Sequence, residues 1–406
     1  MDLERLGALH EWVVARGLSG VAEGELLQGV CERLVAAGLP LRRVFVGLDT
    51  LHPIVEARGA RWERGAGDAE HSEYTRFQEN EDVWLRSPFH ALETSGAPRL
   101  RRRLVDGGYE QGEFPLLDEL RAEGTTDYLA VCTPFHESEP LGQIDSVYSS
   151  WTTDREGGFD DSDLAAIERL LPALALALKA ASTAWIARSL METYLGRDAG
   201  RRVLRGDIAR GAARAIRAII WYSDLGGFTR IADTAPRDQL IPLLNDYADR
   251  LVTAIHAHGG QVLKFMGDGL LAIFDLDDDG AACDRALDAA EHAFAGVAEL
   301  NRRREEDGLP VTRCYLGLHV GEVLYGNVGS LDRLDFTVVG PAVNEASRIE
   351  RMCRSLDQDL IVSSAFAEAG PGCRARLVSL GRYALRGVRR PQELFTLDPE
   401  AAGSCG

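Results

Sequence analysis

The spacing of apolar residues divides the first 180 residues into helices and strands. Two stretches before residue 38 carry apolar residues at helical spacing, which predicts two amphipathic helices. Short apolar runs then predict strands at about 43–49, 54–62, 99–105, 128–133 and 144–150. A helix is predicted at 114–123, and a long helix begins near Phe159, where Asp160 and Asp161 suit a helix N-terminus. Residues 65–96 are polar and show no clear period.

The stretch 181–212 has the pattern of a helical linker. Its apolar residues form one helical stripe that ends at Gly196, and a short amphipathic turn follows at 203–208. Two arrangements are compatible with this pattern. The segment pairs with its copy in a dimer, or it packs as a linker on either neighbouring domain. We therefore expect a domain at 1–180, a linker at 181–212 and a second domain at 213–398.

From residue 215 strands and helices alternate. The pattern predicts strands at 218–222, 335–339 and 359–363, helices at 239–257, 281–300 and 341–354, a β-hairpin at 261–274, a strand pair broken at Gly321 within 312–328, and closing strands within 377–397. The order βαββαβ predicts an α+β domain with an antiparallel sheet and helices on one face. This is the ferredoxin-like arrangement.

Composition and charge narrow the function classes. The chain has 406 residues, 45% of them apolar, which fits a globular protein of two or three domains. Its 45 basic and 63 acidic residues give a net charge of −18, which argues against a general nucleic-acid binder. An acidic protein still binds a nucleotide when metal ions and a few local cations neutralise the phosphates.

Targeting and cysteine patterns predict a cytoplasmic protein with reduced thiols. No stretch reaches the roughly 18 apolar residues of a membrane helix, so we expect no membrane span. The N-terminus lacks the pattern of a secretory signal. The seven cysteines are scattered without a Cys-x-x-Cys pair, so neither a zinc site nor a disulfide framework is indicated.

Two aspartates follow apolar runs that predict strands. Asp224 ends the first run and precedes Gly226 and Gly227, and Asp268 sits between two glycines in the predicted hairpin. Two carboxylates at neighbouring strand ends, with a backbone carbonyl, suit Mg²⁺, which keeps room for water and phosphate. Either aspartate alone is more typical of a turn, but the glycines indicate close approach of another group.

A second set of polar residues lies on one face of a predicted helix. Asn344 and Arg348 are four residues apart, so their side chains are neighbours. The Arg348 guanidinium suits bidentate binding of a phosphate, and Asn344 suits an oxygen of a sugar. A solvated polar face explains the spacing equally well.

Four motifs in this order resemble the class III nucleotidyl cyclase catalytic domain. They are Tyr-Ser-Asp-Leu-Gly-Gly-Phe-Thr (222–229), Lys-Phe-Met-Gly-Asp-Gly (264–269), Gly-Leu-His-Val-Gly-Glu-Val-Leu-Tyr-Gly-Asn-Val-Gly (317–329), and Thr-Val-Val-Gly with Val-Asn-Glu-Ala-Ser-Arg (337–348). The resemblance covers about residues 212–398.

The resemblance implies roles for the residues of both sets. Asp224 and Asp268, with the Leu225 carbonyl, would hold two Mg²⁺ ions, with Mn²⁺ as the alternative. Asn344 would place the ribose, and Arg348 would counter phosphate charge in the transition state.

The resemblance also implies substrate-binding residues. Lys264 and Thr337 would read the purine edge, because a lysine donates to adenine N1 whereas guanine N1 carries a proton. Thr337 replaces the aspartate of the commonest adenylyl pattern, which leaves discrimination against GTP open. Arg386 is the first candidate to bind the triphosphate and Arg389 the second. The segment beside Asp224 adds Phe228 and Thr229.

The activity implied is attack of the ribose 3′-hydroxyl on the α-phosphorus of ATP, which gives 3′,5′-cyclic AMP and pyrophosphate. In this family the site lies between two catalytic domains, so a head-to-tail homodimer is expected. The alternatives are a cyclase that makes cyclic GMP or a cyclic pyrimidine nucleotide, and a degenerate domain that only binds nucleotide. A diguanylate cyclase shares the sheet but would not need Asn344 and Arg348 four apart.

The order of elements in residues 1–180 resembles a GAF-type sensor domain. The resemblance rests on topology and on the segment Trp151–Asp161. Cys132 and His136 are close enough in sequence to touch a cofactor, although a strand cysteine and a loop histidine is the plainer interpretation. A small-molecule or redox sensor, a dimerisation module and a partner-binding domain stay open, and the regulator is unknown.

Overall fold

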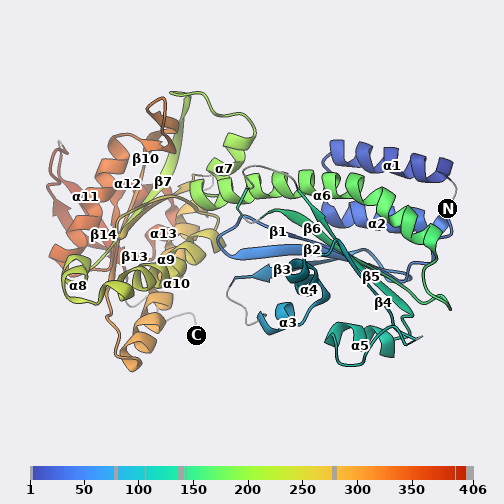
Figure 1. The fold of residues 1–406 in the computed structure, drawn as a ribbon. Coiled ribbons are helices and arrows are strands. Elements are labelled where there is room, and N and C mark those ends of the chain that lie inside the picture. Colours follow the sequence, from blue (N-terminus) through green and yellow to red (C-terminus); the bar gives the residue numbers. More distant parts are fainter. Residues whose placement is uncertain are drawn as a thin grey trace. The chain divides into compact units, whose positions relative to one another are not determined.

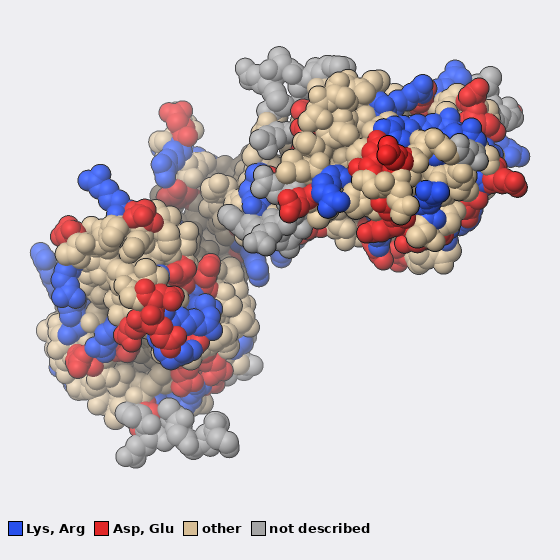
Figure 2. All heavy atoms as spheres, turned by 60° about the horizontal axis from the view of Figure 1, so that its bottom comes forward, with Lys and Arg blue, Asp and Glu red and all other residues tan. Residues whose placement is uncertain are grey.

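The computed structural model shows two compact units, Met1–Leu190 and Met191–Gly406 (Figure 1). It describes residues 3–76, 81–105, 107–135, 141–142, 144–276, 281–388 and 390–398. Each unit has its own sheet. On the face of the molecule in Figure 2, acidic and basic side chains are interspersed, so that face offers no basic surface to a nucleic acid.

The first unit is a six-stranded antiparallel sheet between two sets of helices. The strand order is β3-β2-β1-β6-β5-β4. The strands are β1 (Arg43–Asp49), β2 (Val55–Glu63), β3 (Glu70–Thr75), β4 (Arg99–Arg103), β5 (Asp127–Pro134) and β6 (Ser146–Thr153). The helices are α1 (Leu3–Leu18), α2 (Glu23–Ala36), α3 (Glu81–Leu85), α4 (Pro88–Ser95), α5 (Pro115–Ala122) and α6 (Asp161–Leu195). Helices α1, α2 and α6 share one hydrophobic core with the sheet, and α4 and α5 belong to a second.

Helix α6 is the one helix in the described parts of the chain that is long and apolar enough to cross a membrane by length and composition. Half of the relevant window is buried. Its apolar side chains, such as Ile167 and Leu174, lie in the same core as α1 and α2. A core helix of a globular domain has this pattern, and the expected absence of a membrane span stays a prediction.

The second unit is built on an eight-stranded sheet. Its order is β13-β14-β12-β10-β7-β9-β8, with β11 paired to β10. The strands are β7 (Ala213–Leu225), β8 (Gln261–Met266), β9 (Gly269–Asp275), β10 (Cys314–Gly329), β11 (Leu334–Val339), β12 (Leu360–Ser363), β13 (Leu377–Tyr383) and β14 (Gln392–Leu397). The helices are α7 (Arg197–Leu204), α8 (Phe228–Thr234), α9 (Arg237–Ala257), α10 (Ala281–Glu306), α11 (Pro341–Leu356), α12 (Ser364–Ala369) and α13 (Pro371–Arg374).

The four central strands confirm the ferredoxin-like prediction. In the order β10-β7-β9-β8 they are the fourth, first, third and second strands of a βαββαβ unit. All three pairings among them are antiparallel. Strand β12 departs from the antiparallel rule, because α11 returns the chain so that β12 runs parallel to β10.

Helices cover both faces of this sheet, where the sequence pattern predicted one. Helices α9 and α10 share a core with Ile219 and Trp221 of β7. On the opposite face, α7 and α11 pack on Ile220. The second helical segment of the linker also differs from the prediction. It begins earlier, because α7 covers Arg197–Leu204 and overlaps the predicted turn at 203–208 only at its end, and Gly196, at φ 85°, separates it from α6.

Strand β10 is continuous, so the predicted strand pair broken at Gly321 is wrong. The glycines of β10 instead let α11 approach the sheet. A Cβ on Gly317 would lie 2.7 Å from the Ala346 carbonyl oxygen, and one on Gly321 would lie 2.5 Å from Ala342 Cβ. These contacts leave no room for a side chain, so the glycines mark helix packing and not a turn.

Candidate active site

The two aspartates predicted to bind metal meet at one end of the central sheet. Asp224 is the penultimate residue of β7, and Asp268 lies in the tight turn between β8 and β9, after Gly267 at φ 70°. A Cβ on Gly269 would lie 3.0 Å from the Ser223 carbonyl oxygen and 3.3 Å from Asp224 Oδ1. The glycine therefore lets the turn close on the end of β7.

The electrostatics of the pair fit a cation. The pKa of Asp224 rises from 3.8 to about 6, first through burial and then through the charge and the direct contact of Asp268. A carboxylate whose ionisation is disfavoured by burial and by a neighbouring carboxylate is stabilised when a divalent cation binds beside it. The oxygen donors match the preference of Mg²⁺, and we find no larger His, Cys, Asp and Glu cluster among the described residues that would suit a softer metal.

Glu350 and Arg354, which the sequence analysis missed, face the aspartate pair from α11. Glu350 is 6% exposed, and its pKa rises to about 7, first through burial and then through the charge of Asp224. The charge of Arg354 opposes both shifts. Glu350 lies on the apolar face of α11 together with Ala346. A carboxylate on the apolar face of a predicted helix is unusual, and this pattern would have identified Glu350 from the sequence.

Hydrogen bonds fix the loop that follows Asp224. Gly226 N donates to the Arg313 carbonyl oxygen at 2.7 Å, and Thr312 Oγ1 donates to the Gly226 carbonyl oxygen at 2.6 Å. Thr312 N in turn donates to the Tyr247 hydroxyl at 2.9 Å. The backbone at Leu225, whose carbonyl is the third predicted metal ligand, is thereby held between buried elements.

Helix α11 places Asn344, the residue predicted to orient the ribose, more than a turn from the residues that face the aspartate pair of the same chain. Asn344 is exposed in its first turn. Glu350, which senses the charge of Asp224, lies six residues later, about 9 Å along the helix axis. Arg348 is half-buried against the loop at Gly387, where a Cβ would lie 3.3 Å from Arg348 Nη2. One chain therefore does not bring Asn344 to Asp224 and Asp268.

The two residues predicted to read the base lie on neighbouring elements. Lys264 is half-buried on β8, and β8 contacts β11, which carries Thr337. Thr337 is 5% exposed, and its hydroxyl has no hydrogen-bond partner within the described part of the chain. A buried hydroxyl without a partner is costly, which fits a group that a ligand completes. It must turn outward, or β11 must shift, before it contacts a base.

Composition adds weight to Lys264. The chain has 45 basic residues, and only Lys179 and Lys264 are lysines. Nearly all basic residues of this sequence are therefore arginines. A lysine at the predicted base-reading position is a compact donor where the chain otherwise uses a planar fork.

The remaining predicted substrate residues are spread around this end of the second unit. Phe228 begins α8 and packs against the core shared by α9 and α10, whereas Thr229 beside it is exposed. Arg386 is exposed in the loop between β13 and β14, next to Gly387. Arg389 lies outside the described residues, and so does His136 of the first unit, where Cys132 is half-buried on β5.

The raised pKa of Asp224 predicts a pH-dependent stability without divalent ions. The folded state holds the Asp224 proton up to about pH 6, whereas the unfolded chain releases it near 3.8, so folding loses stability as the pH rises through this window. When a chelator removes divalent ions, the Asp224→Asn variant should therefore become more thermally stable than the native chain as the pH rises from about 4 to 6. The difference in stability should persist above about pH 6. Unfolding midpoints measured against pH test this, and a variant that is less stable at pH 7 would contradict it.

Comparison with known proteins agrees with these features. Residues 213–399 match the family described as the adenylate and guanylate cyclase catalytic domain. An uncharacterised protein of Mycobacterium tuberculosis is 29% identical over 247 residues, which are 61% of this chain and 42% of that protein. An adenylate cyclase of Anabaena cylindrica is 34% identical over 163 residues, 39% of this chain and 32% of that protein. The chain spans about two fifths of the length of its mycobacterial relatives.

Solved structures of cyclases resemble a little under half of the chain. The adenylyl cyclase CyaB from P. aeruginosa is 21% identical with a TM-score of 0.42, over 46% of this chain and 96% of that chain. The guanylyl cyclase Cya2 is 28% identical with a TM-score of 0.41, over 46% and 93%. The family match and the four motifs in order confirm the resemblance seen in the sequence: residues 213–399 are a class III adenylate and guanylate cyclase catalytic domain.

Proposed function

We propose that the protein is an adenylate cyclase, which converts ATP to 3′,5′-cyclic AMP and pyrophosphate. The observation that carries the proposal is the pair Asp224 and Asp268, two carboxylates in contact at a strand end with a raised Asp224 pKa. Cyclases of class III use divalent metal ions, and this donor set fits them. We propose two Mg²⁺ ions, with Mn²⁺ as a substitute, held by Asp224, Asp268 and the Leu225 carbonyl. When bound, such ions acidify the attacking hydroxyl and neutralise phosphate charge.

The chain's own residues bind and orient the nucleotide. Lys264 Nζ donates to adenine N1, and the Thr337 hydroxyl accepts from the adenine amino group. Asn344 orients the ribose so that its 3′-oxygen faces the α-phosphorus. Arg348 stabilises the charge that develops on the phosphate, and Arg386 binds the triphosphate. Phe228 and Thr229, which follow the metal-binding segment in sequence, contact the bound nucleotide.

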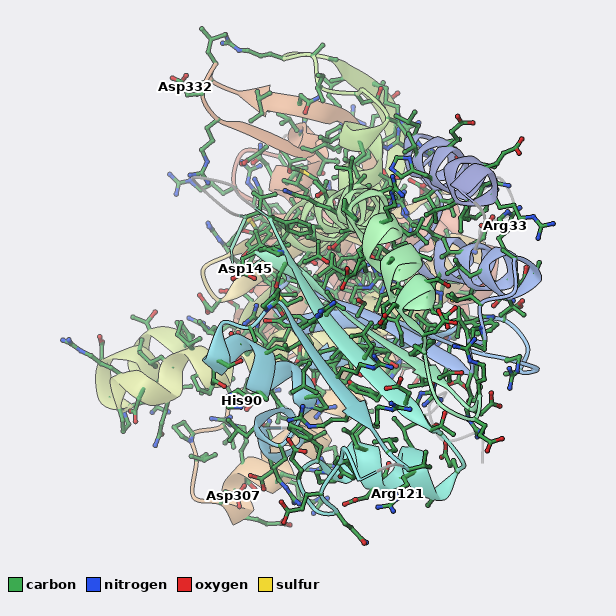
Figure 3. The ribbon with its side chains drawn as sticks, turned by 45° about the vertical axis from the view of Figure 1, so that its right-hand side comes forward. Arg33, His90, Arg121, Asp145, Asp307 and Asp332 are labelled. Atoms are coloured by element: carbon green, nitrogen blue, oxygen red, sulfur yellow. The ribbon has the colours of Figure 1, made fainter. Side chains whose placement is uncertain are left out.

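The site is shared between two copies of the chain. Asn344 lies in the first turn of α11, while the aspartate pair is near later turns, so one chain does not assemble the whole set. The second unit also exposes large apolar side chains on β8 and on the β10–β11 hairpin, namely Phe265, Leu324, Val328, Leu331 and Val339. Asp332 marks the end of this hairpin, which projects from the sheet (Figure 3). A head-to-tail homodimer covers these side chains and forms two equivalent sites.

The first unit is a GAF-like regulatory domain of a cytoplasmic enzyme. The domain covers about residues 1–180, and the linker covers residues 181–212. Its antiparallel sheet with helices on both faces and a long exit helix supports this assignment. Its regulator is a small molecule or a protein partner. The absorbance spectrum and mass of any small molecule that copurifies with the full chain test the assignment.

Nucleotide specificity is the experiment that tests the proposal. The purified full chain is supplied with each of the four nucleoside triphosphates and Mg²⁺, and the cyclic products are separated by chromatography. We expect cyclic AMP from ATP. Lys264→Glu should lower kcat/KM for ATP by about 100-fold, which corresponds to about 2.7 kcal/mol, because its carboxylate repels adenine N1. Lys264→Arg, which keeps a donor, is the matched control.

Thr337 makes a guanylate cyclase the second candidate. Its uncharged, buried hydroxyl selects less strongly between the two purine edges than the aspartate of the common adenylyl pattern. Equal kcat/KM for GTP and ATP in the native chain would contradict adenylate specificity. An unchanged preference for ATP in Lys264→Glu would contradict the role of Lys264 in reading the base.

A further inference from the structure

Two buried cysteines outside the candidate active site lie against each other in the second unit. Cys283 is in the first turn of α10 and Cys373 is in α13, and neither side chain is accessible to solvent. Gly370 lies between them: a Cβ there would be 2.9 Å from Cys373 Sγ and 3.2 Å from Cys283 Sγ. Because Gly370 has no side chain, both sulfur atoms fit into the space beside it.

The hydrogen bonds give the two thiols different roles. Cys373 Sγ donates to the Gly370 carbonyl oxygen at 3.0 Å. The Cys283 thiol interacts directly with Cys373 Sγ and also lies 3.8 Å from the Phe366 carbonyl oxygen. The hydrogen bond from Cys283 lowers the pKa of Cys373, and Arg376 lowers it further, whereas the same hydrogen bond and burial raise the pKa of Cys283. Against the opposing effect of burial, these contacts make Cys373 the more acidic thiol of the pair.

Two other buried cysteines of the second unit differ from Cys373 in the direction of their pKa shifts. Cys314 and Cys353 are also buried in the second unit. Cys353 Sγ donates to the Leu316 carbonyl oxygen at 3.4 Å, and Cys314 Sγ lies 3.8 Å from the Tyr315 carbonyl oxygen. Burial raises the pKa of both thiols. This second pair provides a matched control within the same unit.

We propose that Cys283 and Cys373 are a redox-active dithiol, which a hydroperoxide converts to a disulfide. Because both thiols are buried in the closed fold, the peroxide reaches them when the four-residue helix α13 opens locally. The Cys373 thiolate then attacks a peroxide oxygen, so an S–O bond forms, the O–O bond breaks and hydroxide leaves. Cys283 then attacks the sulfenic sulfur, so the S–S bond forms, the S–O bond breaks, and the second hydroxide leaves as water with the Cys283 proton. Two thiols lose two electrons in all, and one hydrogen peroxide is reduced to two waters.

The disulfide would tie the start of α10 to the segment that precedes the closing strands. Residues 283 and 373 are roughly ninety apart in the sequence, so the bond removes much freedom from the unfolded chain. We expect the oxidised protein to unfold about 5 °C or more above the reduced protein. Both cysteines lie outside the metal and nucleotide residues proposed above, so this inference does not depend on the cyclase reaction.

Peptide mapping of the full chain tests the proposal. The reduced protein is treated with hydrogen peroxide, its remaining thiols are alkylated under denaturing conditions, and it is digested without a reductant. The expected result is one cross-linked peptide pair that contains Cys283 and Cys373, together with an intact mass lower by two hydrogens. Cys314→Ser and Cys353→Ser should leave the cross-link unchanged.

The single variants separate the two roles. In Cys283→Ser, peroxide should leave a sulfenic acid at Cys373 that a dimedone probe labels, whereas in Cys373→Ser the probe should not label Cys283. Circular dichroism verifies that the variants are folded. The proposal is overturned if Cys283 and Cys373 of the native chain are both alkylated in full after peroxide, or if the cross-link joins other cysteines.

Discussion

Asp224→Asn should lower the rate of cyclic AMP formation by about 1,000-fold, which corresponds to about 4 kcal/mol of transition-state stabilisation. Asparagine keeps the size of the side chain and one oxygen but removes the charge that attracts a divalent cation. The loss should appear in kcat at saturating ATP and Mg²⁺. Chromatographic measurement of cyclic AMP from the purified full chain gives the rates.

Two controls separate this effect from damage to the fold. Asp275→Asn changes an exposed aspartate of β9 in the same sheet, opposite Ala218 in β7 and far in register from Asp224, and should keep native activity. The Asp224→Asn protein itself should be at least as stable as the native chain without metal, because the substitution removes repulsion from Asp268. Activity within tenfold of the native rate would contradict the assigned role of Asp224.

Asn344→Ala should lower kcat by about 100-fold, with a smaller change in KM. The side chain is exposed in the first turn of α11, so its removal leaves no cavity and the loss reports on orientation of the ribose. Ser355→Ala, at an exposed position in the last turn of the same helix, is the matched control. Initial rates across a range of ATP concentrations separate kcat from KM. A change confined to KM would show that Asn344 contributes binding alone.

The sequence predicted the sheet of the second unit and the position of the aspartate pair because both depend on local signals. The hairpin that carries Asp268 combines two apolar runs with a tight glycine turn, and β8 and β9 follow it closely. The strand that leads to Asp224 is an apolar run in the centre of the sheet. Strand period and turn residues determine such elements with little help from distant contacts.

Glycines that serve packing were harder to interpret. The sequence pattern predicted a break in a strand at Gly321. In the structure, Gly321 and Gly317 instead allow α11 to pack closely against β10. The information that separates these cases lies in Ala342 and Ala346, more than twenty residues later in the chain. A local pattern does not contain it, because a close helix approach depends on tertiary packing.

Electrostatic partners from distant elements were also missed. Glu350 lies on the same helix as Asn344 and Arg348 but on its buried face. Only the fold shows that this face lies close enough to Asp224 for the Asp224 charge to raise the pKa of Glu350. The Thr337 hydroxyl, which has no hydrogen-bond partner among the described residues, likewise depends on how its strand is packed and not on the motif. In the first unit, β3, α3 and α4 occupy the polar stretch 65–96, where no period was visible.

The central claim is a cyclase site completed by two copies of the chain, and mixing two inactive variants tests it most directly. Asp224→Asn and Asn344→Ala are refolded or coexpressed together with different affinity tags, and doubly tagged heterodimers are purified. One of the two sites in such a heterodimer carries both substitutions, and the other carries neither. A site shared between two copies predicts cyclic AMP formation at about half the native rate. Confirmed heterodimers that stay as inactive as the separate variants would contradict it.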